Sequence, residues 1–245
     1  MGGLKIIPAA SLTFFLGLTA FVSSAGLDCT EDAMIVFDGS GSMSEMGFDT
    51  LDEPRIFEAR RAVRRTIPQI TPYRRVGLLV YGPGEGDSCS NIDLRFGPRV
   101  NAADPIVDAI EALQPDGMTP LSASVKAAAE ALEYRTRPGV VVLVTDGKET
   151  CGGTPCRLGA QLAAEGADLI VHVIGFKVRG DFFSWDSPEQ SGFAEGTVAE
   201  CLATRTGGRY FPAETVDELA EALNSSLGCA VIGRSTPLFA GPSHT

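Results

Sequence analysis

Short apolar runs alternate with amphipathic stretches along most of the chain. Four runs are apolar on both faces and rich in Val, Ile and Leu, which is typical of strands buried in the middle of a parallel sheet; they cover residues 33–38, 75–82, 139–146 and 168–176. A fifth run, residues 92–96, alternates polar and apolar positions and follows a short turn-rich loop, so we expect an antiparallel edge strand. Residues 209–212 are expected to form a brief sixth strand.

Helical patterns lie between these strands. Residues 54–67 place an apolar stripe opposite four arginines, and we expect the arginine face to be solvated. Further helices are expected over residues 106–113, 121–134, 155–165, 195–204 and 216–227, the first two opened by the capping pairs Asp104-Pro105 and Thr119-Pro120. Strands that alternate with helices predict an α/β fold, here a three-layer α/β sandwich. Its mostly parallel, doubly wound six-stranded sheet is flanked by helices on both faces.

The two ends of the chain depart from this pattern. Lys5 precedes an apolar run over residues 6–22, and small residues at 23–25 suit a signal peptidase, so residues 1–25 are interpreted as a secretory signal peptide. An uncleaved membrane anchor is the alternative. We expect one domain over residues 28–229, a flexible C-terminal tail over residues 230–245, and no transmembrane segment after signal cleavage.

The charge of the chain limits the classes of partner it can bind, and its cysteine content indicates the cellular compartment. The net charge of −11 becomes −12 without Lys5, and such an acidic protein repels phosphates, which excludes nucleic acid as a partner. Six cysteines behind a signal peptide indicate disulfides and a secreted or periplasmic protein. A zinc site is disfavoured because the sequence has no Cys-x-x-Cys and only two histidines.

Polar side chains gather where two of the predicted strands end. The sequence Asp-Gly-Ser-Gly-Ser occupies residues 38–42. Asp146 ends the apolar run over residues 139–146, and Thr119 lies on a loop at the same edge. Because ligand sites of parallel sheets form at the carboxyl ends of strands, these side chains should converge. Gly39 and Gly41 are expected to allow the tight turn that aims them. Hard oxygen donors suit Mg²⁺, or alternatively Mn²⁺ or Ca²⁺.

These residues resemble the metal-ion-dependent adhesion site of the von Willebrand factor type A domain. The family pattern, Asp-x-Ser-x-Ser followed by a distant Thr and a distant Asp, is matched by Asp38, Ser40, Ser42, Thr119 and Asp146, and the similarity extends over about residues 32–227. The resemblance implies that the two serines contact the cation directly and that Thr119 joins when a ligand is bound. The two aspartates are implied to act through water. It further implies a binding or adhesion module, in which a protein partner supplies an Asp or Glu to the metal.

The sequence and the resemblance predict the disulfide pairing of only two of the six cysteines. Cys29 and Cys229 flank the domain at the edge opposite the motif, and the resemblance implies a disulfide between them, as in some secreted members of the family. The remaining four cysteines allow three pairings, among which the sequence does not choose: Cys89, Cys151, Cys156 and Cys201.

Two further features leave alternatives open. Glu149 either adjusts the electric field of the site or is solvated. A segment over residues 177–193 carries aromatic side chains that either contact a partner or form a lid over the core: Phe182, Phe183 and Trp185.

An enzyme is not expected. The serines of the motif are not in Gly-x-Ser-x-Gly, His172 lies inside a buried strand, and the chain has no phosphate-binding loop. The alternatives to a binding module are a structural subunit of an envelope assembly with a stabilising metal and, less favoured, a metal-dependent hydrolase.

Overall fold

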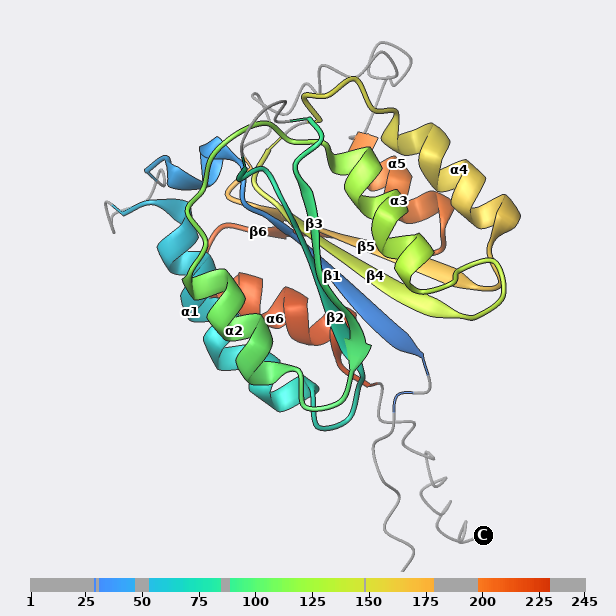
Figure 1. The fold of residues 1–245 in the computed structure, drawn as a ribbon, viewed down its shortest axis with the longest axis horizontal. Helices are drawn as coiled ribbons and strands as arrows, with labels where there is room; N and C mark the ends of the chain where they lie inside the picture. Colours follow the sequence, from blue (N-terminus) through green and yellow to red (C-terminus); the bar gives the residue numbers. More distant parts are fainter. Residues whose placement is uncertain are drawn as a thin grey trace, which may run out of the picture.

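The chain folds around one six-stranded sheet (Figure 1). The computed structural model describes residues 29, 31–46, 53–84, 89–147, 149–178 and 198–229. The strand order is β3-β2-β1-β4-β5-β6, and only the pair β2–β3 at one edge is antiparallel. The strands are β1 (Asp32–Asp38), β2 (Val76–Tyr81), β3 (Ile92–Arg99), β4 (Gly139–Thr145), β5 (Leu169–Phe176) and β6 (Tyr210–Ala213). The predicted sheet and its antiparallel edge are confirmed.

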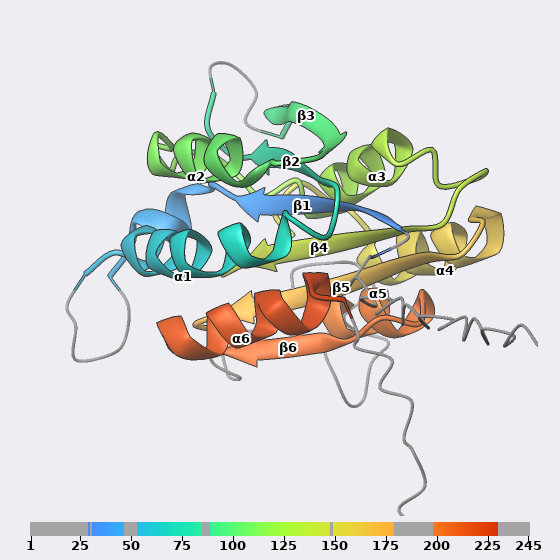
Figure 2. The ribbon, with the colours of Figure 1, turned by 90° about the horizontal axis from the view of Figure 1, so that it is seen from below.

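Helices cover both faces of the sheet (Figure 2). One layer holds α1 (Arg55–Ile70), α2 (Ala103–Glu111) and α6 (Val216–Leu227), and the other holds α3 (Leu121–Ala131), α4 (Pro155–Glu165) and α5 (Val198–Arg205). Each layer has its own apolar core, because successive residues of a strand point to opposite faces. The three-layer sandwich is therefore confirmed. Within the described ranges, no helix combines the length and apolarity needed to cross a bilayer.

Two helix boundaries differ from the expectation. Helix α2 begins at Ala103, so Asp104 and Pro105 lie in its first turn instead of capping it. Helix α3 begins at Leu121 with Pro120 at the N-cap and no side-chain cap bond, which makes the capping role expected of the Thr119-Pro120 pair wrong. It ends at Ala131, and Glu133 then adopts a left-handed backbone with φ of +57°. Tyr134, which is fully buried, accepts a backbone hydrogen bond from Ala167.

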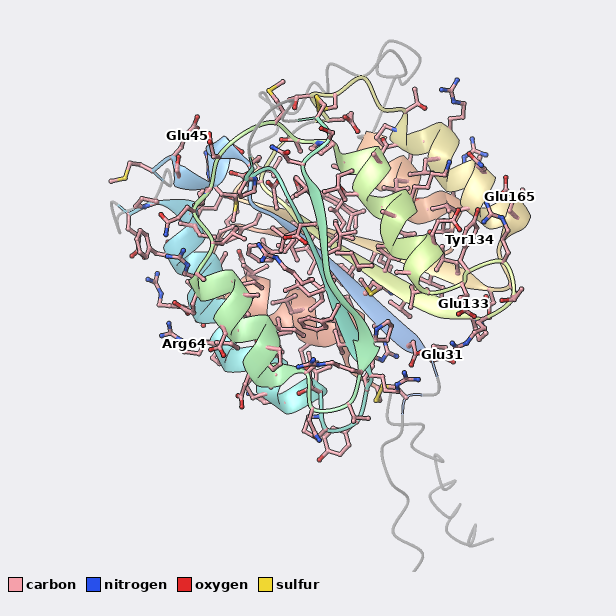
Figure 3. The ribbon with its side chains drawn as sticks, viewed as in Figure 1. Glu31, Glu45, Arg64, Glu133, Tyr134 and Glu165 are labelled. Atoms are coloured by element: carbon pink, nitrogen blue, oxygen red, sulfur yellow. A yellow bond between two sulfur atoms is a disulfide. The ribbon has the colours of Figure 1, made fainter. Side chains whose placement is uncertain are left out.

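The arginine face of α1 is not simply solvated. Arg60 donates to the backbone carbonyls of Ile110 and Leu113, at the end of α2 and just beyond it. Arg64, labelled in Figure 3, pairs with Glu111 of α2, and Arg65 pairs with Asp217 of α6. The face therefore ties α1 to both neighbouring helices, which corrects the expectation.

Three disulfides use all six cysteines. Cys29–Cys229 joins the two ends of the domain, as the resemblance implied. Of the three pairings left open by the sequence, the structure has Cys89–Cys151 and Cys156–Cys201. No cysteine is free, so a thiolate zinc site is excluded. The proposed signal peptide, the tail over residues 230–245 and the aromatic residues Phe182, Phe183 and Trp185 lie outside the described residues.

His172 sits in the middle of β5 as a neutral hydrogen-bond acceptor. Its Nδ1 accepts the backbone N–H of Arg209 at 3.1 Å, which requires an unprotonated nitrogen. Burial, and then the charges of Arg209 and Arg74, lower the pKa of His172 below its ordinary value. The folded protein therefore favours the neutral imidazole.

Loss of the Cys29–Cys229 disulfide is expected to reduce stability. This disulfide closes a loop of 200 residues, and the chain-entropy model assigns such a loop a stabilisation of up to roughly 5 kcal/mol. Urea unfolding of the Cys29→Ser/Cys229→Ser variant should show a free energy of unfolding lower by several kcal/mol. An unchanged urea midpoint would show that the disulfide does not stabilise the protein by restricting the conformational entropy of the unfolded chain.

His172 is expected to make the protein less stable in mild acid. Because its folded pKa lies below the unfolded value of about 6.5, the unfolded chain binds more protons as the pH falls through that value, and stability is lost there. His172→Asn keeps an acceptor but does not titrate. The drop in unfolding free energy between about pH 7.5 and pH 5 should be smaller in this variant than in the wild type; equal drops would contradict the assignment.

Candidate metal site

The Asp-Gly-Ser-Gly-Ser motif lies where β1 ends, beside the end of β4. Figure 3 labels Glu45, which follows the motif, and Glu31, which precedes β1, at opposite ends of the strand. The hydroxyl of Ser40 donates to Asp38 at 2.6 Å, and that of Ser42 donates to Asp146 at 2.7 Å. The two serine oxygens are 3.1 Å apart. Four of the five predicted site residues thus form one hydrogen-bonded cluster.

Thr119, the fifth predicted residue, reaches the same edge through its loop. The backbone N–H of Gly41 donates to the carbonyl of Gly117, two residues before Thr119. On the other side, the backbone of Thr119 donates to the hydroxyl of Thr150 at 2.8 Å and accepts from the Thr150 N–H at 3.1 Å. Thr119 is buried, so its position is set by loops that follow β1 and β4.

Glycine is required around the motif for close packing more than for the turn. A Cβ on Gly39 would lie 2.7 Å from the Leu113 side chain and 2.9 Å from the Tyr81 carbonyl. Neither Gly39 nor Gly41 has a positive φ, so the turn expected to need them does not require glycine. A Cβ on Gly41 would meet nothing closer than 3.6 Å, so that position has no need of glycine for packing either. Gly82 was not singled out, yet its φ of +105° favours glycine, and a Cβ there would lie only 2.6 Å from the Ser40 nitrogen.

Asp146 is paired with a buried arginine that the sequence analysis missed. Arg55, the first residue of α1, is 5% exposed and donates to Asp146 Oδ2 at 3.0 Å and to the Ser42 carbonyl at 2.9 Å. Burial, and then the negative charge of Asp38, raise the pKa of Asp146 to about 7, against the opposing effects of Ser42 and Arg55. Arg55 therefore pairs directly with Asp146, and also with the exposed Glu45 at 3.4 Å. When Asp38 and Asp146 are both ionised, the buried cluster has an excess of negative charge.

The helical spacing of the sequence could have identified Arg55 as a buried residue. Residues 55, 59, 62 and 66 fall on one stripe of α1, and all four are buried. An arginine on a buried stripe needs an acidic partner.

Two hydroxyls that the sequence analysis also missed lie beneath Asp38. Thr145 donates to Asp38 Oδ2 at 2.7 Å, and the Tyr81 hydroxyl donates to Thr145 at 3.2 Å. Burial, and then the charge of Asp38, raise the pKa of Tyr81 well above its ordinary value, so this phenol stays protonated. Both residues end an apolar strand with a polar group, which is the signal that could have found them.

Glu149 anchors loops and is not solvated. Its side chain is buried and accepts the backbone N–H groups of Ser122 and Cys151, each at 2.8 Å. Glu149 therefore joins the start of α3 to the loop that carries the Cys89–Cys151 disulfide. The solvated alternative is wrong.

The donor chemistry of the cluster fits a hard divalent cation. Each serine gives its only proton to a carboxylate, so the lone pairs of both hydroxyl oxygens remain to act as ligands. Within the described part of the chain, no group of three or more His, Cys, Asp or Glu side chains is gathered, so the set relies on hydroxyls as well as carboxylates. Oxygen donors of this kind suit Mg²⁺, Mn²⁺ or Ca²⁺.

Comparison with known proteins identifies the domain. Residues 33–149 match the family model of the von Willebrand factor type A domain. These residues form a von Willebrand factor type A (VWA) domain. The chain is 28% identical over 220 residues to the uncharacterized protein YwmD of Bacillus subtilis (strain 168), a match that covers 86% of this chain and 90% of the relative.

Two solved structures show the same fold in larger proteins. The pilus adhesin SpaC from Lactobacillus rhamnosus GG has a TM-score of 0.59 and 14% identity over 80% of this chain and 30% of the adhesin. Proximal thread matrix protein 1 from the mussel byssus, with a zinc-occupied MIDAS motif (the metal-ion-dependent adhesion site), has a TM-score of 0.51 and 18% identity. That match covers 83% of this chain and 48% of the mussel protein. This VWA chain therefore spans less than half of either protein, and the likeness shows the fold.

Removal of Arg55 is expected to destabilise the protein in the presence of a chelator. Arg55→Met leaves Asp146 buried beside Asp38 without its counter-charge, a change that typically costs roughly 3–5 kcal/mol. Urea unfolding in EDTA measures the loss. The double variant Arg55→Met/Asp146→Asn should recover part of it, because the uncompensated charge is gone. A loss below about 1 kcal/mol in the single variant would contradict a stabilising pair.

Proposed function

We propose that this VWA domain binds a divalent cation, Mg²⁺ in the first instance, and uses it to bind a protein partner. The residues that hold the cation are Asp38, Ser40, Ser42, Thr119 and Asp146. Mn²⁺ and Ca²⁺ are the alternatives, since the oxygen donors suit all three ions. The zinc-occupied MIDAS of the mussel protein, which has the same fold, supports a divalent cation at this site.

The observation that carries the proposal is the direction of the serine hydrogen bonds. Both hydroxyls donate their protons to buried carboxylates, and their oxygens lie 3.1 Å apart, so both oxygens have lone pairs available to a cation. A hydrogen bond to a carboxylate also increases the electron density on the hydroxyl oxygen. Asp38 and Asp146 therefore orient and strengthen two neutral ligands, and they hold the cation indirectly, through water, as the resemblance implies.

The charge balance favours an anionic ligand from outside. With both buried carboxylates ionised, Asp38, Asp146 and Arg55 carry a net charge of −1, so these buried groups only partly compensate a divalent ion. Glu45 also pairs with Arg55, at 3.4 Å, but its side chain is exposed to solvent. When bound, the cation supplies a Lewis-acidic position for an external oxygen ligand. An Asp or Glu of a protein partner completes this balance, and a solved protein with the same fold is a pilus adhesin.

We place the protein among binding modules and not among enzymes. His172 pairs with Val142 in the middle of β4 and β5, three residues before the sheet edge that holds the cluster. The two serines give their protons to carboxylates that are already hydrogen-bonded to other groups. Neither arrangement provides an activated nucleophile beside a general base.

The three disulfides are typical of an oxidising compartment, and we propose that the protein is secreted or periplasmic. A structural subunit of an envelope assembly, in which the cation only stiffens the loops, is the second candidate. The loop contacts of Gly39, Gly41 and Thr119 would serve that role as well. A partner that stays bound after chelation would favour this candidate.

Calorimetric titration with Mg²⁺ and Mn²⁺ tests the cation site. The wild-type protein should show saturable binding, and Asp38→Ala and Ser40→Ala should abolish it while remaining folded. Ser44→Ala is the matched control, because Ser44 is an exposed serine of the same loop whose hydroxyl donates to the Gly41 carbonyl. Binding that is unchanged in both site variants would mean that the motif is structural.

A further inference from the structure

Both carboxylate oxygens of Asp38 are held by donors of known direction. Oδ1 accepts the backbone N–H of Ser40 at 2.8 Å and the Ser40 hydroxyl at 2.6 Å. Oδ2 accepts the Thr145 hydroxyl at 2.7 Å. Asp38, Thr145 and Tyr81 are 0% exposed, so bulk water does not compete for these bonds.

The distances assign the protons in this network. A carboxylate only accepts, and the Thr145 hydroxyl lies much closer to Asp38, at 2.7 Å, than to the Gly147 carbonyl, at 3.4 Å, so its single proton goes to Asp38. The Thr145 oxygen then has only lone pairs to offer, and it accepts from the Tyr81 hydroxyl at 3.2 Å and from the Gly147 N–H at 3.3 Å. Tyr81 thereby polarises Thr145 and makes it a stronger donor to Asp38.

The network joins the ends of three adjacent strands. Asp38 ends β1, Tyr81 ends β2 directly opposite it, and Thr145 ends β4 on the other side. The side chain of Asp38 is therefore fixed by strands that are rigid and paired along their length. Since Ser40 donates to the other oxygen of Asp38, the orientation of this carboxylate also sets where the Ser40 lone pairs point.

We propose that Thr145, supported by Tyr81, is a positioning residue of the cation site. Neither residue contacts the cation, and both act through Asp38 and hence through Ser40. The inference rests on the proposed function. Partners that orient the ligands of a metal typically contribute 10–100-fold to its affinity, and we expect about this effect from the Thr145 hydroxyl.

The test compares Mg²⁺ and Mn²⁺ affinities of full-length variants by calorimetry, with circular dichroism to confirm folding. Thr145→Val keeps the shape and removes the hydroxyl, and should weaken binding about 10–100-fold. Thr145→Ser restores the hydroxyl and should bind within about threefold of wild type, which a role of Thr145 in packing alone would not produce.

Tyr81→Phe is a second, milder variant, which tests the positioning role if Thr145→Val does not fold. It leaves the Thr145 hydroxyl in place, so we expect a smaller loss of affinity, about three- to tenfold. Wild-type affinity in Thr145→Val, or in Tyr81→Phe where only that variant folds, would overturn the inference. So would a Thr145→Ser variant as weak as Thr145→Val.

Failure of the proposed function is distinguishable from failure of this inference. A wild-type protein that binds neither Mg²⁺ nor Mn²⁺ would overturn both. A wild-type protein that binds, together with hydroxyl-free variants that bind equally well, would overturn only the positioning role.

Discussion

Two carboxylates buried side by side are the constraint on which the rest of this sheet edge depends. Asp38 and the side chain of Asp146 are fully buried, at the ends of neighbouring parallel strands. Buried charges are costly unless they are paired and hydrogen-bonded. Around them stand Arg55, two serine hydroxyls and the Thr145 hydroxyl, each of which donates to one of the carboxylates. The remaining negative charge is the basis of the proposal that this edge binds a cation.

Most of the fold could be predicted because the parallel strands are buried on both faces. Such strands appear in the sequence as continuous apolar runs, and the alternating pattern of residues 92–96 separated the antiparallel edge from them. Helix ends were less predictable. Pro105 favours the first helical position, yet tertiary packing extends α2 back to Ala103. The pairing of Cys89 with Cys151 also depends on how loops from β2 and β4 meet, which local patterns do not encode.

The motif residues of the site could be predicted for a similar reason. Residues at the carboxyl ends of parallel strands meet at one edge, so Asp38 and Asp146 converge although 108 positions separate them in the sequence. Arg55, Thr145 and Tyr81 were harder to find, because a single polar residue beside an apolar run is compatible with either solvent or a buried partner. Glu149 shows the same ambiguity, resolved only by its bonds to Ser122 and Cys151. Their partners lie on other strands, loops and helices, and only the folded chain brings them together.

The two roles of hydroxyl groups at this edge follow from where their protons go. Ser40 and Ser42 give their protons to carboxylates and keep lone pairs toward each other, whereas Thr145 keeps its lone pairs toward Tyr81 inside the fold. In the proposed site, the same hydrogen-bond chemistry thus provides ligands on the outer side of the aspartates and support on the inner side. Anomalous diffraction from crystals grown with Mn²⁺ tests this account most directly. The account predicts a single strong peak bounded by Ser40, Ser42 and Thr119, and a peak elsewhere, or none at saturating Mn²⁺, would contradict it.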